Sequence, residues 1–231
     1  MRHEAEADDI AFVKEAFDSL RTPRLLLPAL LLAALLAADK IAILSVLPTT
    51  QNPDHLPYLI AFMLMTLAVI AFVVAILRIL NHSFRSPWQP DSSLWLYGLA
   101  FIASSFLALS ADFVVGGRND HLSGLAAAAL DTAVRAPFAP WLVAIAVERS
   151  LAWRPLPWLS GFSTWLPSFL LWGFLILVPL RQLQLMVNWH YLVAGTDWYW
   201  PAALLDGALG TVIELIALAL ASTAYRRVAR S

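Results

Sequence analysis

The stretch Asp131-Thr-Ala-Val-Arg135-Ala-Pro137-Phe-Ala-Pro140 lies inside an apolar run, 125–147, and decides how the chain is interpreted. Asp131 and Arg135 are four residues apart, so on a helix they share one face and can form an ion pair. Pro137 and Pro140 follow directly, and each proline removes a backbone donor and kinks or interrupts a helix. A charge pair beside a helix break is costly in lipid and needs protein or water around it. We therefore expect a polar centre inside a bundle of membrane helices.

The composition of the chain is that of an integral membrane protein. Of its 231 residues, 60% are hydrophobic and only 13% are charged, with a mean hydropathy of +0.71, whereas soluble domains carry about 25% charged residues. The net charge of −1 gives no indication of a nucleic-acid partner. The absence of cysteine excludes disulfides, thiolate metal sites and cysteine nucleophiles. Ten tryptophans and five tyrosines suit the two interfaces of a bilayer.

The N-terminal segment, 1–23, is expected to lie in the cytoplasm and to contain an amphipathic helix over 8–22. Its first nine residues contain four carboxylates, Glu4, Glu6, Asp8 and Asp9, unlike the basic start of a signal peptide. Ile10, Val13, Phe17 and Leu20 fall on one helical face. This face predicts a helix that lies at the lipid headgroups or one that packs on the cytoplasmic ends of the bundle.

Six membrane spans follow, so the predicted fold is all-α and polytopic, with a transmembrane domain over 24–226 and a cytoplasmic tail over 227–231. Each apolar segment exceeds the roughly 20 residues that a helix needs to cross a bilayer. The loops are short and punctuated by proline, glycine or tryptophan. The predicted spans are Arg24–Leu47, Pro57–Leu80, Leu94–Gly116, Leu122–Glu148, Trp165–Tyr191 and Pro201–Tyr225.

The basic residues predict the orientation of these spans. Lysines and arginines concentrate at both termini and in the loops that hold Arg85 and Arg154, whereas the opposite loops contribute only Arg118. By the positive-inside rule both termini are cytoplasmic, and we expect the chain in a bacterial inner membrane.

The charged residues inside the spans favour the outer half of the membrane. Arg181 lies nine residues before His190, about 14 Å below the outer boundary. On the first, fifth and sixth predicted spans, helical spacing places the polar or small residues of each span on one face of its helix. The second span carries no charge before Arg78, which favours lipid around that span. The candidate ligand-binding residues are Lys40, Asp131, Arg135, Arg181, Gln184, Asn188, Asp206 and Glu214.

Two interpretations of these residues remain open. In the first, they are structural ion pairs, with Asp131 bound to Arg135 and Arg181 bound to Glu214. In the second, they line an outward-facing cavity for a small ligand, because charges inside a membrane often mark function. A bidentate arginine suits a carboxylate or phosphate, so such a ligand would carry an anionic group.

Several site types have no support in the sequence. The histidines lie in loops or at span ends, so no haem or metal site is expected. No glycine-rich phosphate loop occurs. Ser163 lacks the second glycine of a hydrolase elbow. We therefore assign no catalytic residue and no cofactor, and we lean towards a protein that is not an enzyme.

Two stretches resemble a known group. The opening, Asp9-Ile-Ala-Phe-Val-Lys-Glu-Ala-Phe-Asp-Ser-Leu followed by Leu25-Leu-Leu-Pro-Ala-Leu-Leu-Leu, resembles the start of uncharacterised bacterial polytopic proteins. These are the YciC-like proteins and relatives of the membrane domain of glycerophosphoryl diester phosphodiesterases. The closing Ala219-Leu-Ala-Ser-Thr-Ala-Tyr-Arg-Arg is similar to the last helix of that group. The resemblance implies a polytopic fold and no catalytic residue, because the soluble catalytic domain has no counterpart here.

Three functions are consistent with these features. The first is a non-enzymatic inner-membrane protein whose polar cluster is structural or binds a small ligand. The second is a transport component, similar in outline to the substrate-binding subunits of energy-coupling-factor transporters, which would dock a partner subunit through Ala29, Ala33 and Ala37. The third is a membrane enzyme that acts on lipid. In each case the bilayer is the main partner.

Overall fold

The computed structural model describes residues 2–46, 55–83, 86–115, 121–148, 162–188 and 199–230. Throughout these ranges the regular structure is helical, and they contain no β-strand. The elements are α1 (Arg2–Leu20), α2 (Leu26–Val46), α3 (His55–Leu80), α4 (Ser92–Val115), α5 (His121–Arg135), α6 (Ala139–Glu148), α8 (Phe162–Trp172), α9 (Val178–Val187) and α10 (Tyr199–Arg230).

The predicted all-α membrane fold is confirmed at the level of its long apolar helices. Five segments of the described chain are long and apolar enough to cross a bilayer: Pro23–Ala42, Met63–Leu80, Leu125–Glu148, Phe162–Val187 and Trp200–Ala229. A shorter apolar helix covers Ser92–Ser104, the first half of α4. The count of six spans stays a prediction.

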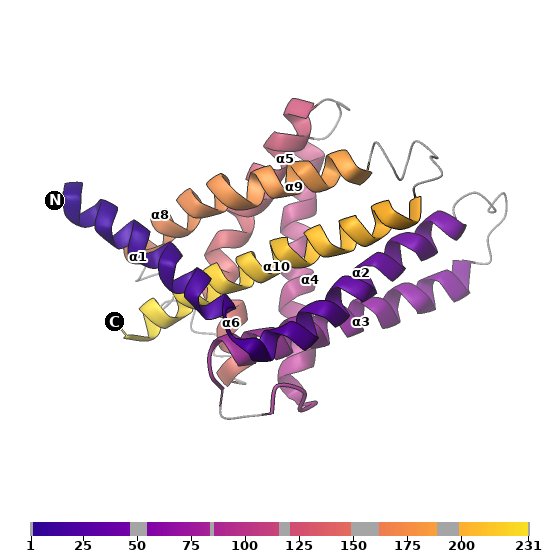
Figure 1. Cartoon of the computed structure of the whole chain (residues 1–231), viewed down its shortest axis with the longest axis horizontal. Coiled ribbons are helices and arrows are strands. Elements are labelled where there is room, and N and C mark those ends of the chain that lie inside the picture. The colour runs from indigo at the N-terminus through magenta and orange to yellow at the C-terminus, as the bar shows by residue number, and fades with distance from the viewer. Residues whose placement is uncertain are drawn as a thin grey trace.

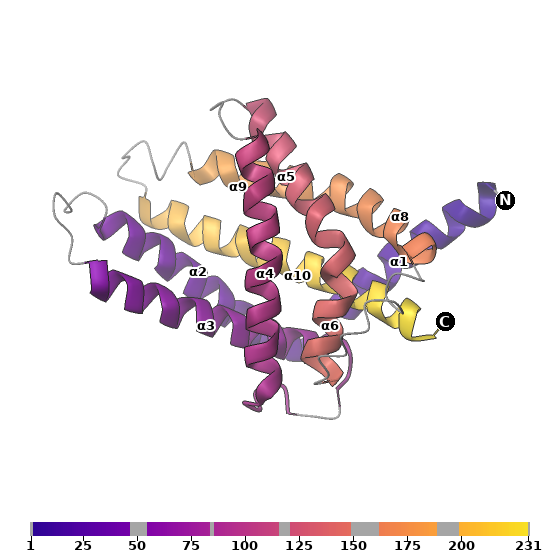
Figure 2. The ribbon, with the colours of Figure 1, turned by 180° about the vertical axis from the view of Figure 1, so that it is seen from behind.

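Helix α10 is the central element of the molecule. It packs against α1, α2, α3, α6, α8 and α9, and it runs through the middle of Figure 1 with α2 along one side. From behind, α4 stands steeply across the oblique α2, α3 and α10 (Figure 2). The C-terminal half of α10 is rich in buried small residues, from Ala219 to Ala224. Such residues let neighbouring backbones approach closely, which drives packing in lipid.

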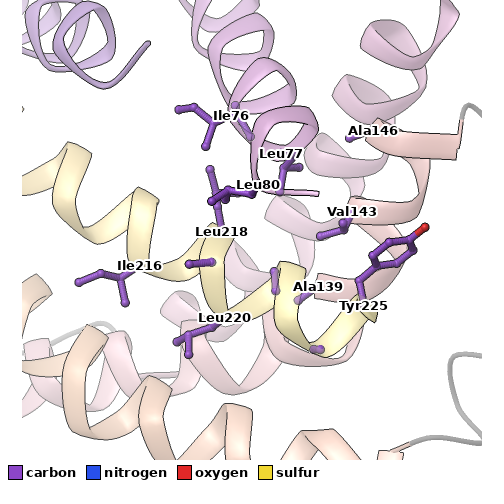
Figure 3. Packing of buried hydrophobic residues seen from close by; sticks show 14 of the residues in the cluster. Ile76, Leu77, Leu80, Ala139, Val143, Ala146, Ile216, Leu218, Leu220 and Tyr225 are labelled. Carbon is purple, nitrogen blue, oxygen red and sulfur yellow. The ribbon is translucent and has the colours of Figure 1, made fainter. Parts of the chain in front are cut away.

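The main apolar core lies where α3, α6 and α10 meet (Figure 3). Ile76, Leu77 and Leu80 of α3 are buried in this cluster, as are Val143 of α6 and Leu220 of α10. The expectation that the second span lies mainly against lipid is therefore wrong for its second half. In its first half, Met63, Leu64 and Leu67 are exposed as expected. A span whose residues are all apolar shows no sequence pattern that distinguishes a half facing lipid from a half buried in protein.

Helix α1 packs against α8 and α10, and its predicted position on the cytoplasmic side stays a prediction. Trp172 Nε1 donates to Asp9 O over 2.9 Å, and Arg226 forms an ion pair with Glu15 at 2.9 Å. The predicted apolar face of this helix was wrong in part. Phe12 and Ala16 are buried, whereas Ile10 of the predicted face is 61% exposed.

Two of the long apolar segments are interrupted midway. A 3-10 turn, Ala136–Phe138, separates α5 from α6 at Pro137, where the sequence predicts a break. A π-helical turn, Gly173–Leu177, separates α8 from α9 and lies just before Pro179. Proline lacks the N–H that a continuous α-helix would use, and π-turns are one way to absorb this loss.

The beginning of α1 and the end of α10 lie at the same end of the molecule (Figures 1 and 2). Helix α10 continues through Arg230, so most of the predicted 227–231 tail is helical.

Candidate ligand-binding site

Asp131 on α5 is the centre of a charged cluster. Arg135, one turn further along the helix, forms an ion pair with its Oδ1 at 2.5 Å, as the i, i+4 spacing predicts. Arg181 of α9 donates to its other oxygen, Oδ2. Asp131 is buried, and both oxygens of its carboxylate are engaged by arginines from two interrupted spans.

The predicted ion pair between Arg181 and Glu214 is replaced by the contact with Asp131. Within the described part of the chain, no residue forms an ion pair or a hydrogen bond with the Glu214 carboxylate. The reason is the close approach of α5 to the π-turn before α9. A Cβ atom added at Gly173 would lie 2.9 Å from Thr132 Cγ2, and Thr132 is the neighbour of Asp131.

A cavity of about 510 Å³ lies beside this cluster, between α2, α3, α4, α5, α9 and α10. Asp131, Arg181, Gln184 and Glu214 supply its charged and amide side chains. The remaining wall is mostly apolar and includes Leu32, Leu36, Val69, Val73 and Ile213. Ligand pockets of this size usually have such a wall with a few polar groups that orient the ligand.

A second cavity of about 100 Å³ adjoins the first and shares Tyr97, Phe101, Arg181 and Glu214 with it. Arg135 also lines the second cavity. The Tyr97 and Phe101 rings stack with centroids 6.2 Å apart, and the Arg135 guanidinium lies 5.6 Å from the Phe101 centroid. These aromatic residues were missed at the sequence level. Their i, i+4 spacing on one helix was the available signal.

Lys40 and Asp206 form a separate polar contact between α2 and α10. Lys40 Nζ lies 3.8 Å from Asp206 Oδ2, and Asp206 is only 2% exposed. Gln184 links this contact to the cavity, because its Nε2 donates to Asp206 O over 3.5 Å. Of the eight predicted residues, Asp131, Arg181, Gln184 and Glu214 line the larger cavity, and Arg135 lines the smaller one. Lys40, Asp206 and Asn188 line neither.

The alanine face of the first span is used inside the chain. A Cβ atom added at Gly207 of α10 would lie 2.5 Å from Ala33 O and 2.9 Å from Ala37 Cβ. Helix α10 therefore covers Ala33 and Ala37, which we expected to dock a partner subunit. These two alanines are therefore used within the chain, and the partner subunit itself stays a prediction.

Arg78 is a second buried arginine, and its surroundings are structural. It donates to Ala146 O, Pro87 O, Gln89 O and Ser93 Oγ and forms an ion pair with Asp91 at 2.8 Å. No group of three or more histidine and carboxylate side chains in the described residues could hold a metal ion. These observations leave the Asp131 cavity as the best candidate site.

Comparison of the chain with protein-family models, with curated proteins and with solved structures found no match. The function is therefore argued from the cavity alone.

Proposed function

We propose that the protein is an integral membrane protein that binds a small amphiphilic molecule in the Asp131 cavity, with the anionic group of the ligand at Arg181. The observation that carries this proposal is the position of Arg181. Its side chain is ion-paired with Asp131, lines the 510 Å³ cavity and remains 24% exposed, so it can be reached from the cavity.

The charge of the cluster supports an anionic group. One carboxylate, Asp131, binds two guanidinium groups, so the cluster keeps a net charge of +1. Each guanidinium has five N–H donors, more than one shared carboxylate can accept. Arginine binds carboxylate or phosphate oxygens as a planar fork. A ligand oxygen at the cavity wall would meet the Arg181 guanidinium there.

The apolar wall supports a ligand with a hydrocarbon part. The leucine, valine and isoleucine side chains from α2, α3 and α10 face the same space as Arg181. Binding of an alkyl chain along such a wall is favoured by the removal of apolar surface from water, about 25 cal/mol per Å². The positive charge of the arginine cluster and the apolar wall of the cavity together suit an amphiphile, a ligand with an anionic head and a hydrocarbon chain.

Octyl phosphate, added to the protein in a non-ionic maltoside detergent, tests this proposal. We expect it to raise the midpoint of thermal unfolding in a saturable way, because a ligand that binds only the folded state stabilises that state. Arg181→Lys should bind about tenfold more weakly, since lysine cannot reproduce the bidentate fork. Native mass spectrometry gives a direct measure of bound ligand.

The matched control is Arg21→Lys, because Arg21 pairs with Asp18 on the surface and its side chain is 81% exposed. This variant should bind octyl phosphate like the unmodified protein. A folded Arg181→Lys variant with unchanged affinity, or no binding to the unmodified protein, would refute the proposed site.

A further inference from the structure

We infer that the ligand is a zwitterion, with an ammonium group held by Glu214 at the same time as its anionic group contacts Arg181. This inference rests on the proposed function and names the chemical class of the ligand. Three features meet at the cavity wall and carry this inference: an arginine cluster, the Glu214 carboxylate, which has no ion pair among the described residues, and two stacked aromatic rings.

Glu214 is the group that the arginine cluster leaves without a counter-charge. It lines both cavities and, within the described chain, forms no ion pair or hydrogen bond. It also lies in the middle of an apolar 30-residue segment, Trp200–Ala229. A carboxylate in such surroundings is costly unless a cation or a hydrogen-bond donor meets it. An ammonium group of a bound ligand would supply that partner.

The charges around the two cavities balance. Among the described residues that line them, Arg135 and Arg181 contribute +2, and Asp131 and Glu214 contribute −2, so the sum of these four charges is zero. A purely anionic ligand would satisfy Arg181 but would place a second negative charge in the same cavity as Glu214. A zwitterion satisfies both signs and leaves the sum unchanged.

The aromatic side chains favour an ammonium that carries methyl groups. Tyr97 and Phe101 line both cavities together with Glu214. The face of Phe101 already supports one cation, the Arg135 guanidinium at 5.6 Å. Aromatic faces attract quaternary ammonium groups through the ring quadrupole, and a nearby carboxylate adds to this attraction. The wall therefore suits a trimethylammonium group.

Four probes separate the contributions that the anionic group, the ammonium group and the alkyl chain of the ligand make to binding. They are octyl phosphocholine, octyl phosphate, octyltrimethylammonium and phosphocholine without a chain. The three octyl compounds share the alkyl chain and differ in the head group, which is a phosphate monoester, a zwitterionic phosphocholine diester or a trimethylammonium. Free phosphocholine distinguishes a water-soluble zwitterion from a membrane amphiphile. Each is titrated below its micelle concentration against the full chain in maltoside detergent, with unfolding midpoint and native mass spectrometry as readouts.

We expect octyl phosphocholine to bind about tenfold more tightly than octyl phosphate, because the second charged contact adds to the first. Octyltrimethylammonium should bind more weakly than octyl phosphocholine, and free phosphocholine more weakly still. Tighter binding of free phosphocholine than of octyl phosphocholine would overturn the amphiphile assignment and favour a soluble zwitterion.

The variant Glu214→Gln keeps the size and removes the charge. It should fold, since the carboxylate has no structural partner among the described residues, and it should lose the preference for octyl phosphocholine while it keeps affinity for octyl phosphate. Glu214→Asp should retain part of the preference. Asp18→Asn, a surface carboxylate exposed at 47%, is the matched control.

Equal affinity for octyl phosphate and octyl phosphocholine, with no effect of Glu214→Gln, would overturn the zwitterion inference and leave the anion site intact. Binding of none of the octyl compounds would refute the proposed function itself. A Glu214→Gln variant that fails to fold would also overturn the inference, because it would show that the carboxylate is structural.

Discussion

At the scale of single residues, Arg78 shows how a buried charge is accommodated at the end of a membrane helix. Its guanidinium is 1% exposed and contacts the carboxylate of Asp91, the hydroxyl of Ser93 and three backbone carbonyls. These contacts connect α3, the segment before α4 and the end of α6. Arg181, in contrast, shares its carboxylate with Arg135 and faces a cavity.

We expect Arg78→Ala to lower the free energy of unfolding by about 3–5 kcal/mol, because it removes a buried ion pair with Asp91 together with the hydrogen bonds to Ser93 and to three backbone carbonyls. The double variant with Asp91→Ala should lose less than the sum of the two single variants. The midpoint of unfolding by sodium dodecyl sulfate in mixed micelles measures both. Additive losses would show that the two side chains do not depend on each other.

At the scale of elements, the contact between α2 and α10 is set by Gly207. Its hydrogen atom, where other residues have a Cβ, allows the backbone of Ala33 to approach. Gly98 of α4 differs, since a Cβ atom there would lie 3.4 Å from Ile70 Cδ1, the end of a flexible side chain. The interrupted pairs α5–α6 and α8–α9 bring Asp131 and Arg181 together beside the cavity. Discontinuous helices form the binding sites of many transporters, so a transport role stays compatible with ligand binding.

Gly207→Ala should destabilise the protein by about 1–3 kcal/mol, because a backbone oxygen at 2.5 Å cannot move without separating two helices. Gly98→Ala is the matched control and should be neutral or stabilising by up to about 1 kcal/mol through its helix propensity. Thermal unfolding of the two variants under identical conditions compares them. Equal effects would mean that α2 and α10 have room to adjust.

At the scale of the whole molecule, both ends of the described chain lie at the same end of the bundle. Arg226 and Arg227 lie at this end and hold α1 through ion pairs with Glu15 and Asp8. We propose that this end faces the cytoplasm, by the positive-inside rule.

Single cysteines test the orientation, and the chain has no native cysteine to interfere. An impermeant maleimide added to intact cells should label cysteines at positions 52 and 119 and should not label one at position 83. Labelling at position 83 should appear after the membrane is permeabilised. The reverse pattern would place the termini outside and invert the proposed orientation.

The local sequence determined the features that depend on spacing along one helix. These are the long apolar helices, the break at Pro137 and the ion pair between Asp131 and Arg135. A helical repeat and a missing N–H act within a few residues, so the sequence is enough to predict them.

Only the tertiary structure decided which faces meet. It pairs Arg181 with Asp131, buries the second half of α3 and covers Ala33 and Ala37 with α10. The physical reason is that side chains facing lipid and side chains facing other helices are both apolar, so hydropathy does not distinguish them. Helix contacts in a membrane depend instead on shape, such as the missing Cβ of Gly207, and on which opposite charge lies within reach.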